Sequence, residues 1–175
     1  VEQYDSAIVT YQRAYRRDTT NCALPYDMGT LFMKVHKYPE AVEMFEKKIA
    51  CDTSSGYRFA SHLNMAMSMM QVKEFKEAKD HVLKSIEYRP DNLQGWQVLA
   101  QVNQQLGQTA DEIVAYRKVI ELAIAADTGD TPGKHNNQLE EAYRTIGVEL
   151  LIKASKEKPQ NPKSYIGSLE YLKKA

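Results

Sequence analysis

The side chains best suited to acid–base or metal chemistry in this sequence are four histidines, His36, His62, His81 and His135. Only His135 has acidic neighbours within one polar loop, namely Asp127 and Asp130. Their spacing matches neither an EF-hand loop nor a zinc signature. We therefore predict that the protein has no metal site and needs no cofactor.

The remaining histidines are predicted to be structural or solvated. His62 falls on the packing stripe of a helical pattern and is expected to be packed, whereas His36 and His81 are expected near helix ends or on outer faces, in solvent. No glycine-rich phosphate loop, nucleophile elbow or His-Glu-x-x-His segment is present. The carboxylates alternate with lysines, which is typical of solvated helix faces. We predict that the protein is not an enzyme.

The two cysteines, Cys22 and Cys51, are predicted to lie near each other in space. Cys22 opens one helical segment, and Cys51 closes the antiparallel segment that follows it. The ends of a helical hairpin are neighbours, so a disulfide is within reach, with Cα atoms about 4.4–6.8 Å apart. Two small buried thiols are the favoured interpretation and the disulfide is the alternative, because the sequence does not give the directions of the two side chains. A bond would favour an exported protein, but the sequence alone predicts no localisation.

Length and charge restrict the class of partner. The 175 residues suffice for one domain with a sizeable core. Lys+Arg and Asp+Glu both number 23, so the net charge is zero and no general affinity for nucleic acid or anionic membrane is expected. No apolar run approaches the roughly 20 residues of a membrane span. Composition and charge therefore point neither to a nucleic-acid partner nor to a membrane surface.

Similar helical segments recur along the chain, with a small residue at the same place in most of them. Ala7, Ala41, Ala78 and the exception Glu112 follow one another at intervals of 34, 37 and 34 residues. Four positions after each stands a bulky residue: Tyr11, Phe45, Val82 and Tyr116. A second helical pattern precedes the last three of these segments, centred on Gly29, Ala66 and Ala100, and it recurs near the end of the chain at Gly147. Small residues at these positions allow the two helices of a pair to approach closely.

A helical hairpin repeated at about 34 residues is typical of tetratricopeptide repeats, and the chain resembles the tetratricopeptide-repeat (TPR) family over nearly its whole length. Pro90 supplies the proline that ends a repeat in this family, whereas Thr19 and Thr53 stand there in earlier repeats. The resemblance implies an all-α fold: a right-handed superhelical solenoid of antiparallel helix pairs, with about nine helices.

We expect one solenoid domain over residues 1–175, without β sheet, with helices near residues 4–18, 22–36, 39–51, 57–72, 75–88, 92–105, 110–126, 138–158 and 163–175. Its first part is the second helix of a truncated repeat, at residues 1–20. Three repeats follow, at residues 22–55, 56–92 and 93–126. A loop at residues 127–137 then leads to an irregular last repeat at residues 138–175. Because residues 4–17 lack a first helix, we expect the chain to be a fragment of a longer protein. Thr109 and Glu112 are predicted to form a capping box, and Pro39 to lie in a first helical turn.

The resemblance implies that the first helices of successive repeats line a concave groove, which holds an extended peptide or a helix of a partner. Each first helix carries a second stripe beside its packing stripe, which is either additional core or a binding surface. Methionines on it offer an adaptable apolar surface, and glutamines offer donors and acceptors. The predicted groove residues are Tyr26, Thr30, Met33, Leu63, Met67, Met70, Gln94, Gln97, Gln101, Gln104 and Arg144. Charged residues are expected on the outer faces, including Glu43, Lys47 and Lys79.

Some family members hold the C-terminal carboxylate of chaperones with a clamp of lysine, asparagine and arginine side chains. Here Asn64 matches the clamp, but Tyr26 and Thr30 replace its first residues, and Gln94 and Val98 replace its later ones. A chaperone tail is therefore disfavoured as a partner. We predict a protein-interaction module with a partner of unknown identity; the alternative is a structural or assembly subunit that self-associates through its repeat ends.

Overall fold

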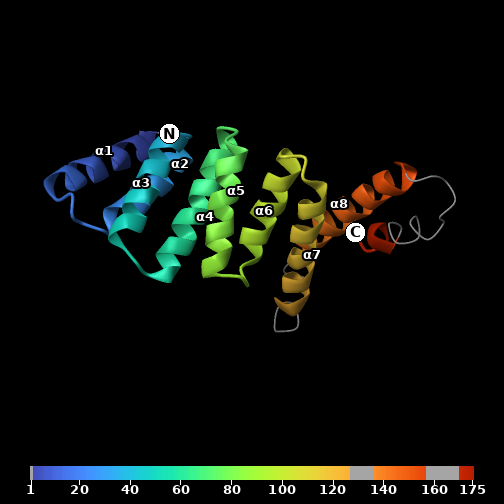
Figure 1. Ribbon diagram of the computed structural model, residues 1–175. Coiled ribbons are helices and arrows are strands. Elements are labelled where there is room, and N and C mark those ends of the chain that lie inside the picture. Colours follow the sequence, from blue (N-terminus) through green and yellow to red (C-terminus); the bar gives the residue numbers. More distant parts are fainter. Residues whose placement is uncertain (1, 127–135, 157–169) are drawn as a thin grey trace. The chain divides into compact units, whose positions relative to one another are not determined.

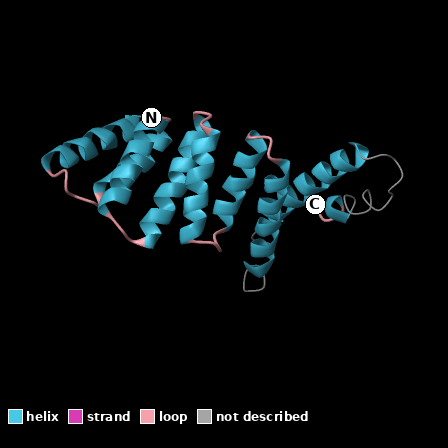
Figure 2. Ribbon diagram, in the orientation of Figure 1, coloured by secondary structure: helices cyan, strands magenta, loops and turns pink. Residues whose placement is uncertain are grey.

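The computed structural model describes residues 2–126, 136–156 and 170–175. The regular elements in these ranges are all α-helices, and no strand occurs in them (Figures 1 and 2). This confirms the all-α prediction. The helices are α1 (Glu2–Arg17), α2 (Leu24–Lys34), α3 (Tyr38–Cys51), α4 (Ser55–Gln71), α5 (Phe75–Tyr88), α6 (Leu93–Gln105), α7 (Thr109–Ala126) and α8 (Asn136–Lys156).

Most of the predicted helices are therefore present, with ends that differ by one to a few residues. Of the helix expected at residues 163–175, only residues 170–175 lie in the described part, and residues 170–172 are helical. Pro39 lies in the first turn of α3, as predicted. The predicted capping box is wrong, because Thr109 is already the first residue of α7 and the Glu112 amide donates to the Gln108 carbonyl at 2.9 Å.

The chain divides into two compact units, residues 1–90 and 91–175. In the first unit, α1 packs on α2, α2 on α3, α3 on α4, and α4 on α5. In the second unit, α6 packs on α7 and α7 on α8. Each helix thus makes most of its contacts with its neighbours in the chain, which is the pattern of a repeat protein.

Small residues lie at the points of closest helix approach. Ala41 and Ala78, from the predicted small-residue positions, have no exposed surface. A Cβ atom on Gly29 would lie 2.7 Å from the ring of Phe45, and one on Gly147 would lie 2.6 Å from Cγ of Leu172. Real Cβ atoms do not approach heavy atoms so closely, so these positions require glycine unless the neighbouring side chain moves.

Each unit has its own apolar core. The first unit buries a cluster from α1 to α4, made of Ile8, Met28, Phe32, Ala41, Met44, Phe45 and Met65. The second unit buries residues from α6 to α8, including Leu99, Val102, Ala115, Tyr116, Val119 and Ile146. Within the described ranges, no helix is both long enough and apolar enough to cross a bilayer.

Candidate functional site

The predicted groove residues of the first unit lie on α2 and α4, which are the first helices of two repeats. Tyr26, Met33, Met67 and Met70 are half-buried, as is Thr30. Half-burial leaves part of each side chain accessible while the rest is held by packing, so these residues still offer surface to a partner.

Leu63 differs from the other residues of this stripe. It is only 4% exposed and belongs to the core, so it offers little surface to a partner. The Thr30 hydroxyl donates to the carbonyl of Asp27 at 2.8 Å, within its own helix. The accessible part of the stripe therefore consists mainly of Tyr26 and the three methionines.

Tyr26 joins the two first helices. Its ring meets Phe45 edge-on at 5.6 Å between centres and Tyr57 at 5.4 Å. Its hydroxyl accepts a hydrogen bond from Nδ2 of Asn64 on α4, at 3.2 Å. Asn64, the residue that matches the chaperone clamp, is thus engaged by a neighbouring helix. We name the surface formed by Tyr26, Tyr57, Met33, Met67 and Met70 the aromatic–methionine face.

In the second unit, the predicted groove residues lie on α6 and α8. Gln97 is half-buried, and the other glutamines of α6, Gln94, Gln101 and Gln104, are exposed. Arg144 is exposed on α8. Val98, which stands at the clamp position, is buried and offers no charge. This face is polar and unlike the face of the first unit.

Tyr57 and Lys48 were not predicted from the sequence. Tyr57, on α4, is 45% exposed, and Lys48, on α3, is only 3% exposed. Nζ of Lys48 lies 3.6 Å from the centre of the Tyr57 ring, in cation–π contact. A sequence signal for the burial of Lys48 exists, because it continues the spacing of Ala41, Met44 and Phe45 on α3. No comparable signal exists for its partners.

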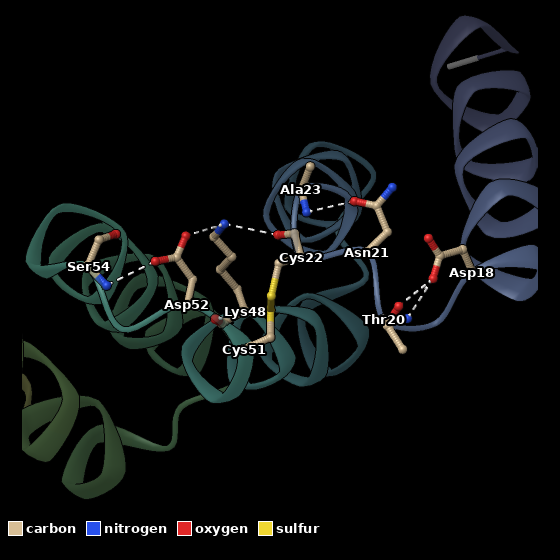
Figure 3. Close-up of a disulfide and its surroundings, with 9 residues drawn as sticks. All are labelled: Asp18, Thr20, Asn21, Cys22, Ala23, Lys48, Cys51, Asp52 and Ser54. Atoms are coloured by element: carbon tan, nitrogen blue, oxygen red, sulfur yellow. Dashed lines mark hydrogen bonds and ion pairs between the residues drawn. A yellow bond between two sulfur atoms is a disulfide. The ribbon is translucent and has the colours of Figure 1, made fainter.

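Cys22 and Cys51 form a disulfide, with their Cα atoms 5.8 Å apart, so the bridged alternative is the one found (Figure 3). Nζ of Lys48 donates to the carbonyl of Cys22 at 2.9 Å and forms an ion pair with Asp52 at 2.8 Å. Asp52 also accepts from the amide of Ser54 at 2.9 Å. These hydrogen bonds, first that of Lys48 and then that of Ser54, hold the pKa of Asp52 well below its ordinary value.

His62 and His81 form a contact between α4 and α5. The prediction of a packed His62 is confirmed, but that of a solvated His81 is wrong, because the antiparallel pairing of these helices brings Nδ1 of His81 to 3.0 Å from Nδ1 of His62. The ring centres are 5.3 Å apart. The distance between the ring centres exceeds the distance between the two Nδ1 atoms by about twice the length from an imidazole nitrogen to its ring centre. Both Nδ1 atoms therefore lie on the line between the rings and point at each other. This geometry suits one N–H···N hydrogen bond.

The histidine pair is held in a neutral state. His62 stacks on Tyr88, and Nη1 of Arg58 donates to the Tyr88 hydroxyl at 3.2 Å. Burial, with smaller effects of His81 and nearby cations, lowers the pKa of His62 to about 4. Burial likewise lowers the pKa of His81.

The described residues contain no group of three or more histidine, cysteine or acidic side chains that is arranged to hold a metal ion. His135, Asp127 and Asp130 lie outside those residues, so the structure says nothing of them. The predicted outer-face residues Glu43 and Lys47 form an exposed ion pair at 2.6 Å on α3, a second helix of a repeat.

Comparisons with known proteins agree with the repeat architecture. Residues 93–123 match the family model of the tetratricopeptide repeat. The structure is similar to a crystal structure of MamA, with 21% identity, a TM-score of 0.77, and coverage of 98% of this chain and 85% of that one. It is also similar to YrrB, described as a TPR protein with an unusual peptide-binding site, with 16% identity, a TM-score of 0.68, and coverage of 98% and 77%.

A further similar structure is MamA from Desulfovibrio magneticus RS-1, residues 41 to the end, with 15% identity, a TM-score of 0.72, and coverage of 98% of this chain and 82% of that one. At such identities the likeness concerns the fold. The search of curated proteins found no match.

Proposed function

We propose that this chain, a tetratricopeptide-repeat solenoid, is a non-enzymatic module that binds an extended segment of a protein partner through the aromatic–methionine face of its first unit. The TPR match at residues 93–123 and the similarity to solved TPR structures support a protein-interaction module. The peptide-binding site named for YrrB supports the choice of an extended segment.

The observation that carries the proposal is the apolar surface that side chains of α2 and α4 leave accessible to solvent. Met67 and Met70 are half-buried and are not members of the buried cluster of the first unit, and Tyr57 leaves 45% of its surface in solvent. Methionine side chains adapt to irregular surfaces, and a tyrosine offers a large ring at little cost in conformational entropy. An apolar side chain of the partner therefore gains contact on this face.

The glutamine-rich face of α6 is proposed as a polar contact. Each glutamine amide carries two N–H donors and one acceptor oxygen, which suits the alternating donors and acceptors of an extended backbone. Gln97 and Gln101 are half-buried and exposed, respectively, so Gln97 is better fixed by its surroundings. This contact is tested by its own variant, Gln97→Ala/Gln101→Ala.

The experiment is the selection of binding peptides from a displayed random library, followed by measurement of dissociation constants. We expect Met67→Glu to weaken the selected peptides at least about tenfold, since contacts at the centre of an interface carry most of its free energy. The matched control is Lys47→Ala on α3, which is expected to change the affinity less than about twofold because exposed ion pairs contribute little. Equal affinities of both variants for every selected peptide would contradict the proposal.

Self-association through the repeat ends is the competing function. It predicts that the mass measured by light scattering rises with protein concentration. It also predicts that the selected peptides do not compete with self-association. A mass that stays at that of one chain up to the highest soluble concentration would argue against it.

A further inference from the structure

The disulfide lies at one end of the helical hairpin formed by α2 and α3. Cys22 stands two residues before the first residue of α2, and Cys51 is the last residue of α3. Cys51 is exposed and Cys22 is half-buried, so the bond lies where a reductant can approach it. The next residues of α2, Pro25 and Tyr26, lead directly into the aromatic–methionine face.

Lys48 connects this disulfide to the start of α4. Its buried ammonium group has three neighbours: the Cys22 carbonyl at 2.9 Å, the carboxylate of Asp52 at 2.8 Å, and the Tyr57 ring at 3.6 Å (Figure 3 shows the first two). A buried ammonium group is stable only while such neighbours replace the water that it has lost. Displacement of the Cys22 carbonyl removes one of these three neighbours, and we infer that Lys48 then shifts toward solvent and away from Tyr57.

Tyr57 transmits the change to the binding surface. Its ring lies between Lys48 and Tyr26, whose ring centre is 5.4 Å away. Tyr26 also contacts the Phe45 ring, and its hydroxyl accepts from Asn64, so we expect the more exposed Tyr57 to be the member of the pair that moves. An unbroken series of contacts thus runs from the disulfide to the aromatic–methionine face.

We propose that the Cys22–Cys51 disulfide controls the aromatic–methionine face through Lys48, which acts as a positioning residue for Tyr57, so that reduction of the bond weakens partner binding. The regulatory part of this inference rests on the function proposed above. The coupling from the disulfide to Tyr57 is a property of the chain alone and can be measured without a partner.

The reductant is a dithiol. One of its thiolates attacks a sulfur of the disulfide, breaks the S–S bond and forms a mixed disulfide, and its second thiolate then displaces the protein sulfur. Two electrons and two protons pass to the protein, giving free thiols at Cys22 and Cys51 and an internal disulfide in the reductant. Without the covalent link, only non-covalent contacts hold the Cys22 carbonyl near Lys48.

The first measurement follows the rings of Tyr26 and Tyr57 by NMR in fluorotyrosine-labelled protein, before and after treatment with dithiothreitol. We expect the Tyr57 resonance to move toward that of a solvated tyrosine on reduction. The Cys22→Ser/Cys51→Ser protein should show the reduced-like spectrum with and without the reductant. An identical Tyr57 resonance in oxidised and reduced folded protein would overturn the inference, whatever a peptide does.

Two variants test Lys48 while the disulfide stays intact, so that the result does not depend on the stability of the reduced protein. In Lys48→Met the side chain stays long but loses its charge, and the Tyr57 resonance should move as it does on reduction. In Lys48→Arg the cation is kept, and the oxidised spectrum should be largely restored. Unchanged Tyr57 resonances in Lys48→Met would equally overturn the inference.

The second measurement is the affinity of a selected peptide for oxidised and reduced protein. We expect reduction to weaken binding about fivefold or more, the usual range for coupling between two sites. If no peptide binds the oxidised protein on this face, the proposed function fails while the ring spectra still test the coupling. A ring that responds together with an unchanged peptide affinity would overturn the control of binding by the disulfide.

Discussion

Nζ of Lys48 lies 2.9 Å from the carbonyl oxygen of Cys22, so one buried cation ties the turn before α2 to the last turn of α3 beside the disulfide. The two links have different physical natures. The disulfide is covalent and acts mainly on the unfolded chain, whereas the Lys48 contact exists only in the folded protein. Because both links involve Cys22, their contributions to stability are expected to be coupled, and each is measured with its own variant below.

Breaking the disulfide should destabilise the first unit. Its cysteines are 29 positions apart in the sequence, and closing a loop of that length in the unfolded chain corresponds to about 3.5 kcal/mol in the chain-entropy model. We expect the Cys22→Ser/Cys51→Ser protein to lose about that amount of unfolding free energy in urea titrations. A loss below about 0.5 kcal/mol, with an unchanged spectrum on addition of reductant, would show that the cysteines are not bridged in solution.

Replacing Lys48 and its neighbour Lys47 by methionine should have unequal effects. Lys48→Met leaves the Cys22 carbonyl without its donor, and we expect the unfolding free energy to fall by about 1–3 kcal/mol. Lys47→Met removes an exposed ion pair with Glu43 and should change it by less than about 0.5 kcal/mol. Urea titrations of the two proteins at neutral pH decide this, and equal effects would contradict the assigned role of Lys48.

The packing of α2 against α3 should not tolerate a side chain at Gly29. In Gly29→Ala the new Cβ atom meets the Phe45 ring at 2.7 Å, and we expect a loss of about 1–3 kcal/mol from overpacking. Gly56→Ala is the control, because its nearest neighbour, an Arg89 nitrogen, is 3.6 Å away. There, replacing a helical glycine should stabilise by a few tenths of a kcal/mol, up to about 1. Thermal melts that rank the two variants in the opposite order would contradict this packing.

The His62–His81 pair should make the first unit sensitive to acid. Burial lowers the pKa of His62 in the folded protein to about 4, below its ordinary value of 6.5, so between these values the unfolded chain binds more protons. Stability is then fully present above pH 6.5 and falls as the pH drops toward 4. The two pKa values alone correspond to a loss of about 3 kcal/mol at pH 4, and solvent screening of the partly exposed pair reduces this to on the order of 1–2 kcal/mol. Lys84 and Arg58 strengthen the effect, whereas Glu46 and Asp80 oppose it at His81.

The measurement is the unfolding free energy at pH 7.0, 6.0, 5.0 and 4.5 in wild type, His81→Gln and His36→Gln. His81→Gln should flatten the dependence, because one basic ring and its hydrogen bond are gone. His36→Gln should leave it unchanged, since His36 is exposed and lies outside the pair, with Nδ1 at 2.8 Å from the Tyr38 hydroxyl. A pH dependence that persists in His81→Gln and disappears in His36→Gln would show that it does not arise from the His62–His81 pair.

The repeat architecture was predictable because it depends on periodic packing. Ala41, Ala78 and Gly29 stand at repeated positions, and their burial follows from helical spacing alone. The same spacing indicates that Lys48 is buried, as it continues the stripe on α3. It does not indicate why a cation is tolerated there, because its partners come from three different segments.

The errors arose where a contact depends on the rotation of one helix about its axis. His81 was expected in solvent, but a modest rotation of α5 relative to α4 is enough to bring its ring onto His62. Thr109 was placed one position outside the helix that it begins. Tyr57 gave no signal at all, since it stands in the first turn of α4 and its exposed ring resembles any other surface residue until Lys48 and Tyr26 are placed beside it.

The central claim, that a partner segment binds the aromatic–methionine face, is tested most directly by NMR with methyl-labelled methionine and a peptide selected from the library. We predict that the methyl resonances of Met33, Met67 and Met70 shift and broaden on peptide addition, while that of the buried Met44 on α3 stays in place. Saturable shifts confined to residues of α3 and α5, with these three methionines unchanged, would contradict the account.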